Sequence, residues 1–369
     1  MKKCSLLILI VVLVTSLLAP KTVYALESDL TVEDMSFENS EKSARNALMK
    51  NLQSHLEVFA TDTGSTRACL DKLSEITIFE GFRVYQRGAE KDESSLTFYY
   101  PIVQNKEVKL LAAVDKIGDN TWNISISEYG ASYINRYSDY LSYTIYSEGD
   151  TWIFAPKAAS ERRAPEVIGR YHLEHSKTLS LLSRETKGNQ SDKFYVNTDT
   201  YKFLNMDNCL MLQEADGTKY GLCWAASAAT MIRYITGNRT VSAFSIADEF
   251  HIGYNDGIET LSTIRSALLR HGVTSQYRYV ARQAVSLTEI YHNINNAYPI
   301  AMGMQGRVLS VIPYGKHVVT IVGYNGSTLI MWDSASGKIV TTSYNDKKTT
   351  YKLFAYTYTW IQSVLIPLP

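Results

Sequence analysis

An apolar stretch from Cys223 to Ile235 restricts the possible folds of this chain more than any other segment. Its alanines and isoleucines leave almost no polar side on a helical wheel, and a helix that is apolar nearly all round is buried. Thr236-Gly237 supplies a C-terminal stop, and Gly221 permits a tight turn just before the helix. The sequence therefore predicts a domain packed around a buried helix that begins at Cys223.

The position of Cys223 in the first turn of that helix bears on its chemistry. Unpaired backbone N–H groups and the positive end of the helix dipole favour a thiolate there, and can lower a thiol pKa from ~8.5 into the range ~3.5–7.5. Most free cysteines are nevertheless small buried hydrophobic residues. Taken alone, the position of Cys223 fits a nucleophile and a buried core residue equally well.

The N-terminus has the pattern of a secretory signal. Two lysines precede an apolar run over residues 6–18, and Val23-Tyr24-Ala25 follows. The run is shorter than the ~20 apolar residues of a membrane-spanning helix. We therefore predict a signal peptide over residues 1–25, a secreted mature chain that begins at Leu26, and no membrane segment after cleavage.

Removal of Cys4 with the signal leaves an odd number of cysteines, namely Cys69, Cys209 and Cys223. In an oxidising compartment at least one thiol then stays unpaired and is a candidate reactive group. The three are too far apart in the sequence to form a tetrahedral zinc site of their own, and no Cys-x-x-Cys motif is present. Reactivity is the better interpretation of the leftover thiol.

The rest of the chain divides into two parts. An amphipathic helix is predicted over residues 37–60, and short strands over residues 76–154 predict an antiparallel sheet. A polar linker is predicted over residues 183–199. We therefore expect a β-rich N-terminal domain with its linker over residues 26–195 and a second domain over residues 196–369.

Equal numbers of basic and acidic residues, 37 of each, argue against a nucleic-acid binder.

A second chemical group lies at the start of a predicted strand. His317 opens the alternating run 318–323, the segment 324–327 turns the chain, and a returning strand ends at Asp333. A three-residue loop over 325–327 places Asp333 diagonal to His317 on the same face. A two-residue loop places it on the opposite face, so pairing of the two side chains requires the odd-length loop or a bend at the strand end. A paired histidine and carboxylate are a base and its orienting group.

These motifs together resemble the papain-like cysteine peptidases, nearest to the compact bacterial secreted branch that includes streptopain, staphopain and C39-like peptidases. The matching motifs are Gly-Leu-Cys-Trp-Ala-Ala at 221–226, Lys-His-Val-Val-Thr-Ile-Val-Gly-Tyr at 316–324 and Trp-Asp at 332–333. The resemblance covers about residues 205–369. It implies an α+β fold, with a helical half that carries the cysteine and an antiparallel sheet half that carries the histidine and aspartate. It also gives the β-rich N-terminal domain the role of an inhibitory prodomain.

The resemblance implies a role for each site residue. Cys223 would be the nucleophile, His317 its general base and later acid, and Asp333 the orienting group. Gln213 would be the oxyanion donor, although it lies further upstream of the cysteine than is usual in the family. Such an enzyme is a secreted zymogen that hydrolyses protein or peptide substrates, with no metal or organic cofactor and no nucleic-acid partner.

Two other functions stay open. A transglutaminase-like acyltransferase also orders Cys, His and Asp along the chain, but with a much shorter gap between Cys and His. A degenerate papain-like domain would bind peptides, with the N-terminal sheet as an adhesion module. A disulfide between Cys69 and Cys209 would keep a prodomain attached after cleavage, so we predict that these two cysteines are not paired.

Overall fold

The computed structural model describes residues 30–60, 69–79, 81–82, 84–86, 96–105, 107–119, 121–128, 131, 143–148, 151–156, 179–180, 201–206, 208–215, 218–281, 285–308, 312–346, 349–353 and 356–368. The predicted signal peptide and the linker at 183–199 lie outside these ranges, as does the predicted domain boundary near residue 195. Contacts divide the chain into two compact units, Met1–Ser43 and Ala44–Pro369. None of the helices within the described ranges combines the length and apolar character needed to cross a bilayer.

The predicted N-terminal helix is present as α2 (Leu30–Leu56). Within Ala44–Pro369, its buried side chains recur every four residues and so form one stripe along the helix: Ala44, Leu48, Leu52 and Leu56. His55 lies beside this stripe and is also fully buried. The stripe explains why a segment of mixed composition forms a helix here.

The N-terminal region is β-rich, as predicted. Its main strands form an antiparallel series: β1 (Thr77–Ile78), β3 (Thr97–Gln104), β4 (Glu107–Gly118) and β5 (Thr121–Ser127), with β8 (Leu179–Ser180) beside β1. A smaller sheet contains β2 (Val84–Gln86), β6 (Tyr143–Glu148) and β7 (Thr151–Pro156). In that smaller sheet β2 pairs with β6 in parallel, which differs from the fully antiparallel arrangement that we expected.

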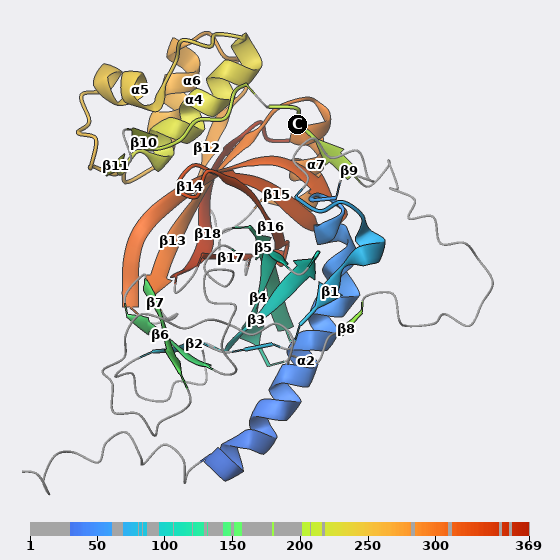
Figure 1. Ribbon diagram of the computed structural model, residues 1–369. Helices are drawn as coiled ribbons and strands as arrows, with labels where there is room; N and C mark the ends of the chain where they lie inside the picture. Colours follow the sequence, from blue (N-terminus) through green and yellow to red (C-terminus); the bar gives the residue numbers. More distant parts are fainter. Residues whose placement is uncertain are drawn as a thin grey trace, which may run out of the picture. The chain divides into compact units, whose positions relative to one another are not determined.

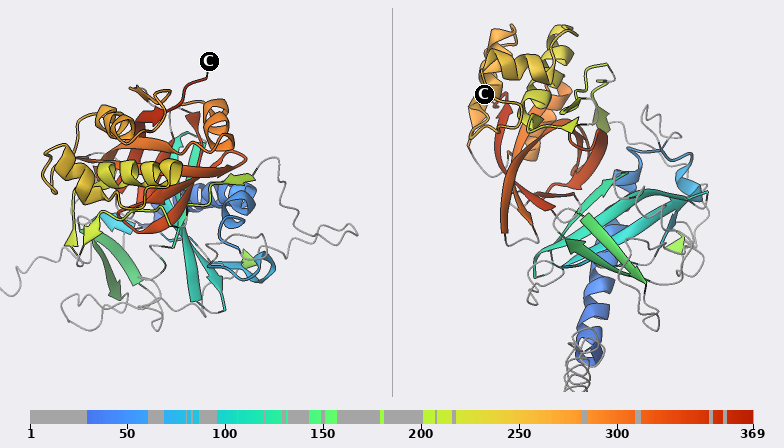
Figure 2. Two further views of the ribbon diagram at one scale, coloured as in Figure 1. Left: turned by 90° about the horizontal axis from the view of Figure 1, so that it is seen from above. Right: turned by 60° about the vertical axis from the view of Figure 1, so that its left-hand side comes forward.

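The buried helix α4 (Cys223–Thr236) begins and ends as predicted. Ten consecutive residues from Cys223 to Ile232 are buried. Gly237 adopts a positive φ of 74°, and its N–H donates to the carbonyl of Arg233, which stops the helix. The remaining helices of this half are α5 (Ala243–Glu249), α6 (Ser262–Arg270) and α7 (Leu287–Asn295). Figures 1 and 2 show α5 and α6 beside α4.

The antiparallel sheet of the C-terminal half follows the helices and confirms the α+β class. Its strands are β12 (Arg278–Val280), β13 (Ile300–Val308), β14 (Ile312–Asn325), β15 (Thr328–Asp333), β16 (Lys338–Ser343), β17 (Thr350–Leu353) and β18 (Tyr356–Leu365). They pair in the order β12-β18-β13-β14-β15-β16, while β17 pairs with β18 and β9 (Tyr201–Phe203) pairs with β14. Helix α4 packs against β14 and β13 (Figure 1).

Strand β5 joins this sheet to the N-terminal strands. It pairs antiparallel with β16, where Ser125, Ile126 and Ser127 lie opposite Thr342, Thr341 and Val340. Backbone hydrogen bonds therefore join the N-terminal and C-terminal regions in one continuous sheet. The proposal that residues 26–195 are a separate domain stays a prediction, and any such domain docks by adding strands to the edge of β16.

Candidate active site

Cys223 is the first residue of α4 and is 9% exposed. Its place at the helix N-terminus puts it among backbone N–H groups that have no partner within the helix. The chain reaches this position through a close backbone contact at Gly221. A Cβ atom there would lie 2.8 Å from the carbonyl oxygen of Asn255, so only glycine fits without a shift.

His317 and Asp333 lie side by side at neighbouring strands. Nε2 of His317 is 2.9 Å from Oδ1 of Asp333, and the two side chains are 7% and 0% exposed. An ionised carboxylate only accepts hydrogen bonds, so Nε2 carries the proton in this pair. The other ring nitrogen is thereby not used by Asp333, and Cys223 is among the groups that raise the pKa of His317.

A β-bulge on β14 produces the register that this pairing needs. The turn between β14 and β15 has two residues, Gly326 and Ser327, because Asn325 lies opposite Thr328. The odd-length loop is therefore not formed, and the pairing of His317 with Asp333 needs an irregularity in the strand instead. The ladder shifts by one residue between Ile321 and Gly323, which leaves Val322 as the extra residue of a bulge.

Beyond the bulge, Thr320 lies opposite Trp332, so the next position of the ladder aligns Val319 with Asp333. This is the register expected from the odd-length loop. Asp333 is then diagonal to His317 on the same face of the sheet.

The electrostatics favour an imidazolium–carboxylate pair. Burial alone would lower the pKa of His317, but the charge of Asp333 and hydrogen bonds with Asp333 and Cys223 outweigh burial and raise this pKa above its usual value. Burial alone would raise the pKa of Asp333. The charge of His317, with hydrogen bonds from His317, the Ala335 N–H and the Tyr351 hydroxyl, instead lowers it. The arrangement can therefore hold a proton on His317 beside an ionised Asp333.

Gln213 lies closer to the site than its sequence position suggests. The hairpin of β10 (Glu214–Ala215) and β11 (Thr218–Lys219) takes up the extra residues, and the Tyr220 N–H donates to the carbonyl of Gln213 at 3.0 Å. The side chain donates from Nε2 to the Tyr220 carbonyl at 2.8 Å and accepts from the Ser334 hydroxyl at 3.0 Å. One amide hydrogen is not used by these bonds, and the oxyanion role of Gln213 stays a prediction.

Two tyrosines that the sequence analysis did not identify also reach the site. The Tyr351 hydroxyl donates to Oδ2 of Asp333 at 2.9 Å, and the Tyr358 ring lies 5.2 Å from the His317 ring, centroid to centroid. Nothing in their local sequence distinguishes them among 26 tyrosines.

The other cysteines do not share the setting of Cys223. Cys69, Cys209 and Cys223 are all free thiols, which agrees with the prediction that the first two are not paired. Burial and the charge of Glu128 raise the pKa of Cys69 to about 12, so its thiol is a poor nucleophile. Within the described ranges no group of His, Cys, Asp and Glu could hold a metal ion.

Comparison with known proteins addresses the C-terminal half. A model of the Peptidase_C39 like family matches residues 206–364, a range that includes Gln213, Cys223, His317 and Asp333. No curated protein matches the chain.

Proposed function

From the premise that residues 206–364 form a Peptidase_C39-like domain of the papain-like cysteine peptidases, we propose that this chain is an endopeptidase that uses Cys223, His317 and Asp333. The observation that carries the proposal is the His317–Asp333 hydrogen bond of 2.9 Å beside a cysteine at a helix N-terminus. A histidine bound through Nε2 to a carboxylate presents its other nitrogen to the thiol in a fixed orientation.

The proposed reaction proceeds through a thioester. The Cys223 thiolate attacks the peptide carbonyl carbon, a C–S bond forms, and the negative charge moves to the carbonyl oxygen. The Cys223 backbone N–H and the free amide hydrogen of Gln213 would stabilise that oxyanion. His317 protonates the departing amine as the C–N bond breaks. It then takes a proton from water, which attacks the thioester and releases the acid and the thiolate.

Peptidase activity can be tested with the chain from Leu26 to Pro369 and denatured casein under reducing conditions. We expect cleavage by the wild-type chain and by a Cys209→Ala variant, and none by Cys223→Ala. Cleavage that survives Cys223→Ala, or a wild-type chain that cleaves nothing even after loss of its N-terminal region, would contradict the proposal. Transfer of a labelled amine to casein in place of hydrolysis would instead favour an acyltransferase.

The proposal extends to secretion and to synthesis as a zymogen. The N-terminal pattern supports export, and the pairing of β5 with β16 supports an inhibitory prodomain that docks on the C-terminal sheet. After expression in a bacterium, the protein in the medium should begin at Leu26. Activity should then rise as the N-terminal region is cut away. Full activity of the uncut chain would contradict the inhibitory role but not the peptidase assignment.

A further inference from the structure

A hydroxyl outside the three proposed catalytic residues reaches the carboxylate of Asp333. We propose that Tyr351 is a positioning residue for Asp333, and that strands β4 and β5 of the N-terminal region hold Tyr351 in place by binding its two neighbours in the chain. The inference rests on the proposed function, because it concerns the same site.

The first observation is that both oxygens of the Asp333 carboxylate are bound. Oδ1 lies 2.9 Å from Nε2 of His317 and accepts the Ala335 N–H at 2.9 Å, while Oδ2 accepts the Tyr351 hydroxyl at 2.9 Å. Asp333 and Tyr351 are fully buried. A carboxylate held at both oxygens cannot rotate, so Oδ1 stays directed at the imidazole.

The second observation is that Tyr351 belongs to an aromatic wall behind the site. It lies directly opposite Tyr358 in the pairing of β17 with β18, and their rings stack with centroids 6.2 Å apart. The Tyr358 ring in turn contacts His317. One face of this hairpin therefore supports both His317 and Asp333.

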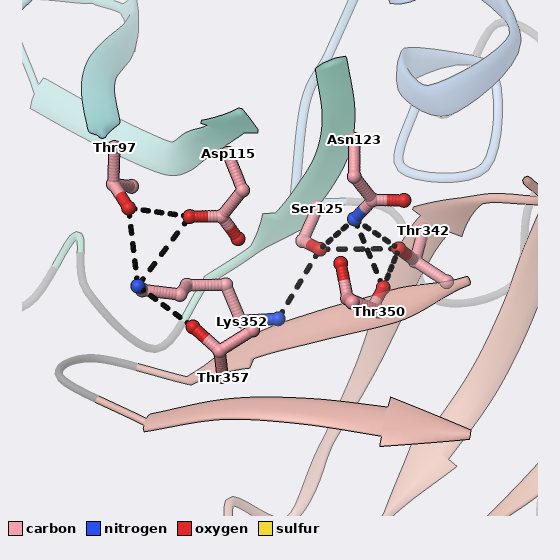
Figure 3. Close-up of polar contacts among 8 residues, drawn as sticks. All are labelled: Thr97, Asp115, Asn123, Ser125, Thr342, Thr350, Lys352 and Thr357. Carbon is pink, nitrogen blue, oxygen red and sulfur yellow. Dashed lines mark hydrogen bonds and ion pairs between the residues drawn. The ribbon is translucent and has the colours of Figure 1, made fainter. Parts of the chain in front are cut away.

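The third observation is that the residues on either side of Tyr351 bind the N-terminal strands (Figure 3). Asn123 on β5 donates from Nδ2 to the carbonyl of Thr350 at 2.9 Å. The backbone N–H of Lys352 donates to the Ser125 hydroxyl at 3.3 Å. Both backbone links lie within one residue of Tyr351.

The Lys352 side chain makes a further link to the N-terminal strands. Its Nζ lies 3.4 Å from Oδ1 of Asp115 on β4 and donates to Thr97 at 3.1 Å and to Thr357 at 2.9 Å. Lys352 and Asp115 are 7% and 5% exposed, so this ion pair is buried (Figure 3). Successive residues of a strand point to opposite faces, so Lys352 extends toward β3 and β4 while Tyr351 extends toward Asp333.

The short strand β17 thus connects the N-terminal region to the proposed catalytic carboxylate. Within the described ranges β17 pairs as a strand only with β18. Its backbone is also bound by Asn123 and Ser125 of β5 and by Thr342 of β16, and the Lys352 side chain binds Asp115 of β4. In the uncut chain, a substitution that breaks these contacts should leave Tyr351 less well fixed. The hydrogen bond that orients Asp333 should then weaken.

The role of Tyr351 is tested in the chain from Leu26 to Pro369 with Tyr351→Phe, which removes only the hydroxyl. The background carries Cys69→Ser and Cys209→Ser, so that Cys223 is the reacting thiol. Two readouts need no substrate: the NMR titration of the His317 ring and the rate of Cys223 alkylation by iodoacetamide against pH. We expect His317 to lose its proton about one pH unit lower, and alkylation to slow at low pH because less thiolate is paired with imidazolium.

The matched control is Tyr324→Phe. It removes a hydroxyl on β14 that donates to Asn295 of α7 at 2.7 Å, and should shift neither readout. Tyr351→Phe should add no further shift in an Asp333→Asn chain, where the charge that it positions is absent. If Tyr351→Phe caused a general loss of structure, the His317 titration would shift alike in chains with Asp333 and with Asn at position 333.

The link to the N-terminal strands is tested with Asn123→Leu, which removes the bond to Thr350. We expect a shift in the same direction as that of Tyr351→Phe, and none in a chain that already carries Tyr351→Phe. Glu128→Gln is the control, because Glu128 accepts a bond from Lys338 of β16 at 2.7 Å, away from β17.

An unchanged His317 titration in folded Tyr351→Phe overturns the positioning role. An unchanged titration in Asn123→Leu overturns the link to the N-terminal strands, and this variant decides the inference if Tyr351→Phe does not fold. If the His317 titration shifts as expected but the wild-type chain cleaves no peptide, the proposed function is contradicted while the positioning role of Tyr351 is supported.

Discussion

The imidazole Nε2 of His317 lies 2.9 Å from Oδ1 of Asp333, although the turn that joins their strands would by itself align Asp333 with Thr320. The bulge at Val322 removes this mismatch. Next to the bulge, Gly323 approaches the carbonyl of Lys202 on β9 so closely that a Cβ atom would lie 2.5 Å from it. The site therefore depends on an irregular stretch of β14 that is fixed from both edges.

Replacement of Asp333 by Asn should lower activity and narrow its pH range. The carboxylate charge raises the pKa of His317, so its loss lets the imidazolium deprotonate at a lower pH. The alkaline limb of the kcat/KM profile should move to lower pH, with a decrease of about 10²-fold near neutrality. An alkaline limb that stays in place would show that Asp333 does not set the protonation of His317.

Gly221→Ala should impair catalysis more than stability. The new Cβ would meet the backbone oxygen of Asn255 at 2.8 Å, and relief of that contact displaces the start of α4, where Cys223 lies two residues later. A displacement of ~1 Å can cost ~10²-fold in rate, so we expect kcat to fall by about that factor. Gly257→Ala is the control, since its Cβ meets nothing within 4 Å. Equal kcat values for the two variants would contradict this reading.

The local parts of the site could be predicted from the sequence. A helix that is apolar nearly all round indicated α4 and the place of Cys223, and alternation indicated the strands that carry His317 and Asp333. Both patterns arise from the side chains of the segment itself, so they are visible without a structure.

The remaining features depend on contacts between distant segments. The bulge at Val322 and the bond from Tyr351 to Asp333 leave no periodic signal. The hairpin that brings Gln213 beside Tyr220 could not be recognised from its short strands. The pairing of β5 with β16 joins residues more than two hundred positions apart, and strand edges carry no mark of their partner in the sequence.

Gln213→Ala should lower kcat by about 10²-fold with little change in KM, the usual result when one oxyanion donor is removed. The structural bonds of Gln213 must be separated from this effect. Ser334→Ala removes the hydroxyl that orients the amide oxygen but leaves the amide hydrogens, and should therefore cost less than Gln213→Ala. Steady-state kinetics of both variants on one peptide separate the two roles. Equal decreases in kcat would assign Gln213 a structural role.

His55 should make the docking of α2 on β16 sensitive to acid. Its ring binds the Thr341 hydroxyl at 2.8 Å and the Ser343 hydroxyl at 3.2 Å, and burial lowers its pKa from 6.5 to about 3. Glu57, the nearest acidic residue along the chain, accepts a bond from Asn325 at 2.6 Å, and burial is the cause of the lowered pKa of His55.

The sign of this effect follows from the lowered pKa. Above pH 6.5 the ring is neutral whether docked or exposed, so it carries no penalty. As the pH falls from 6.5 towards 3, the exposed ring binds a proton that the buried ring excludes. Stability should then decrease by at most about 1.4 kcal/mol per pH unit from this group. Urea unfolding of wild type and His55→Gln over this range measures the difference. Parallel pH dependences of the two proteins would show that His55 titrates normally in the folded chain.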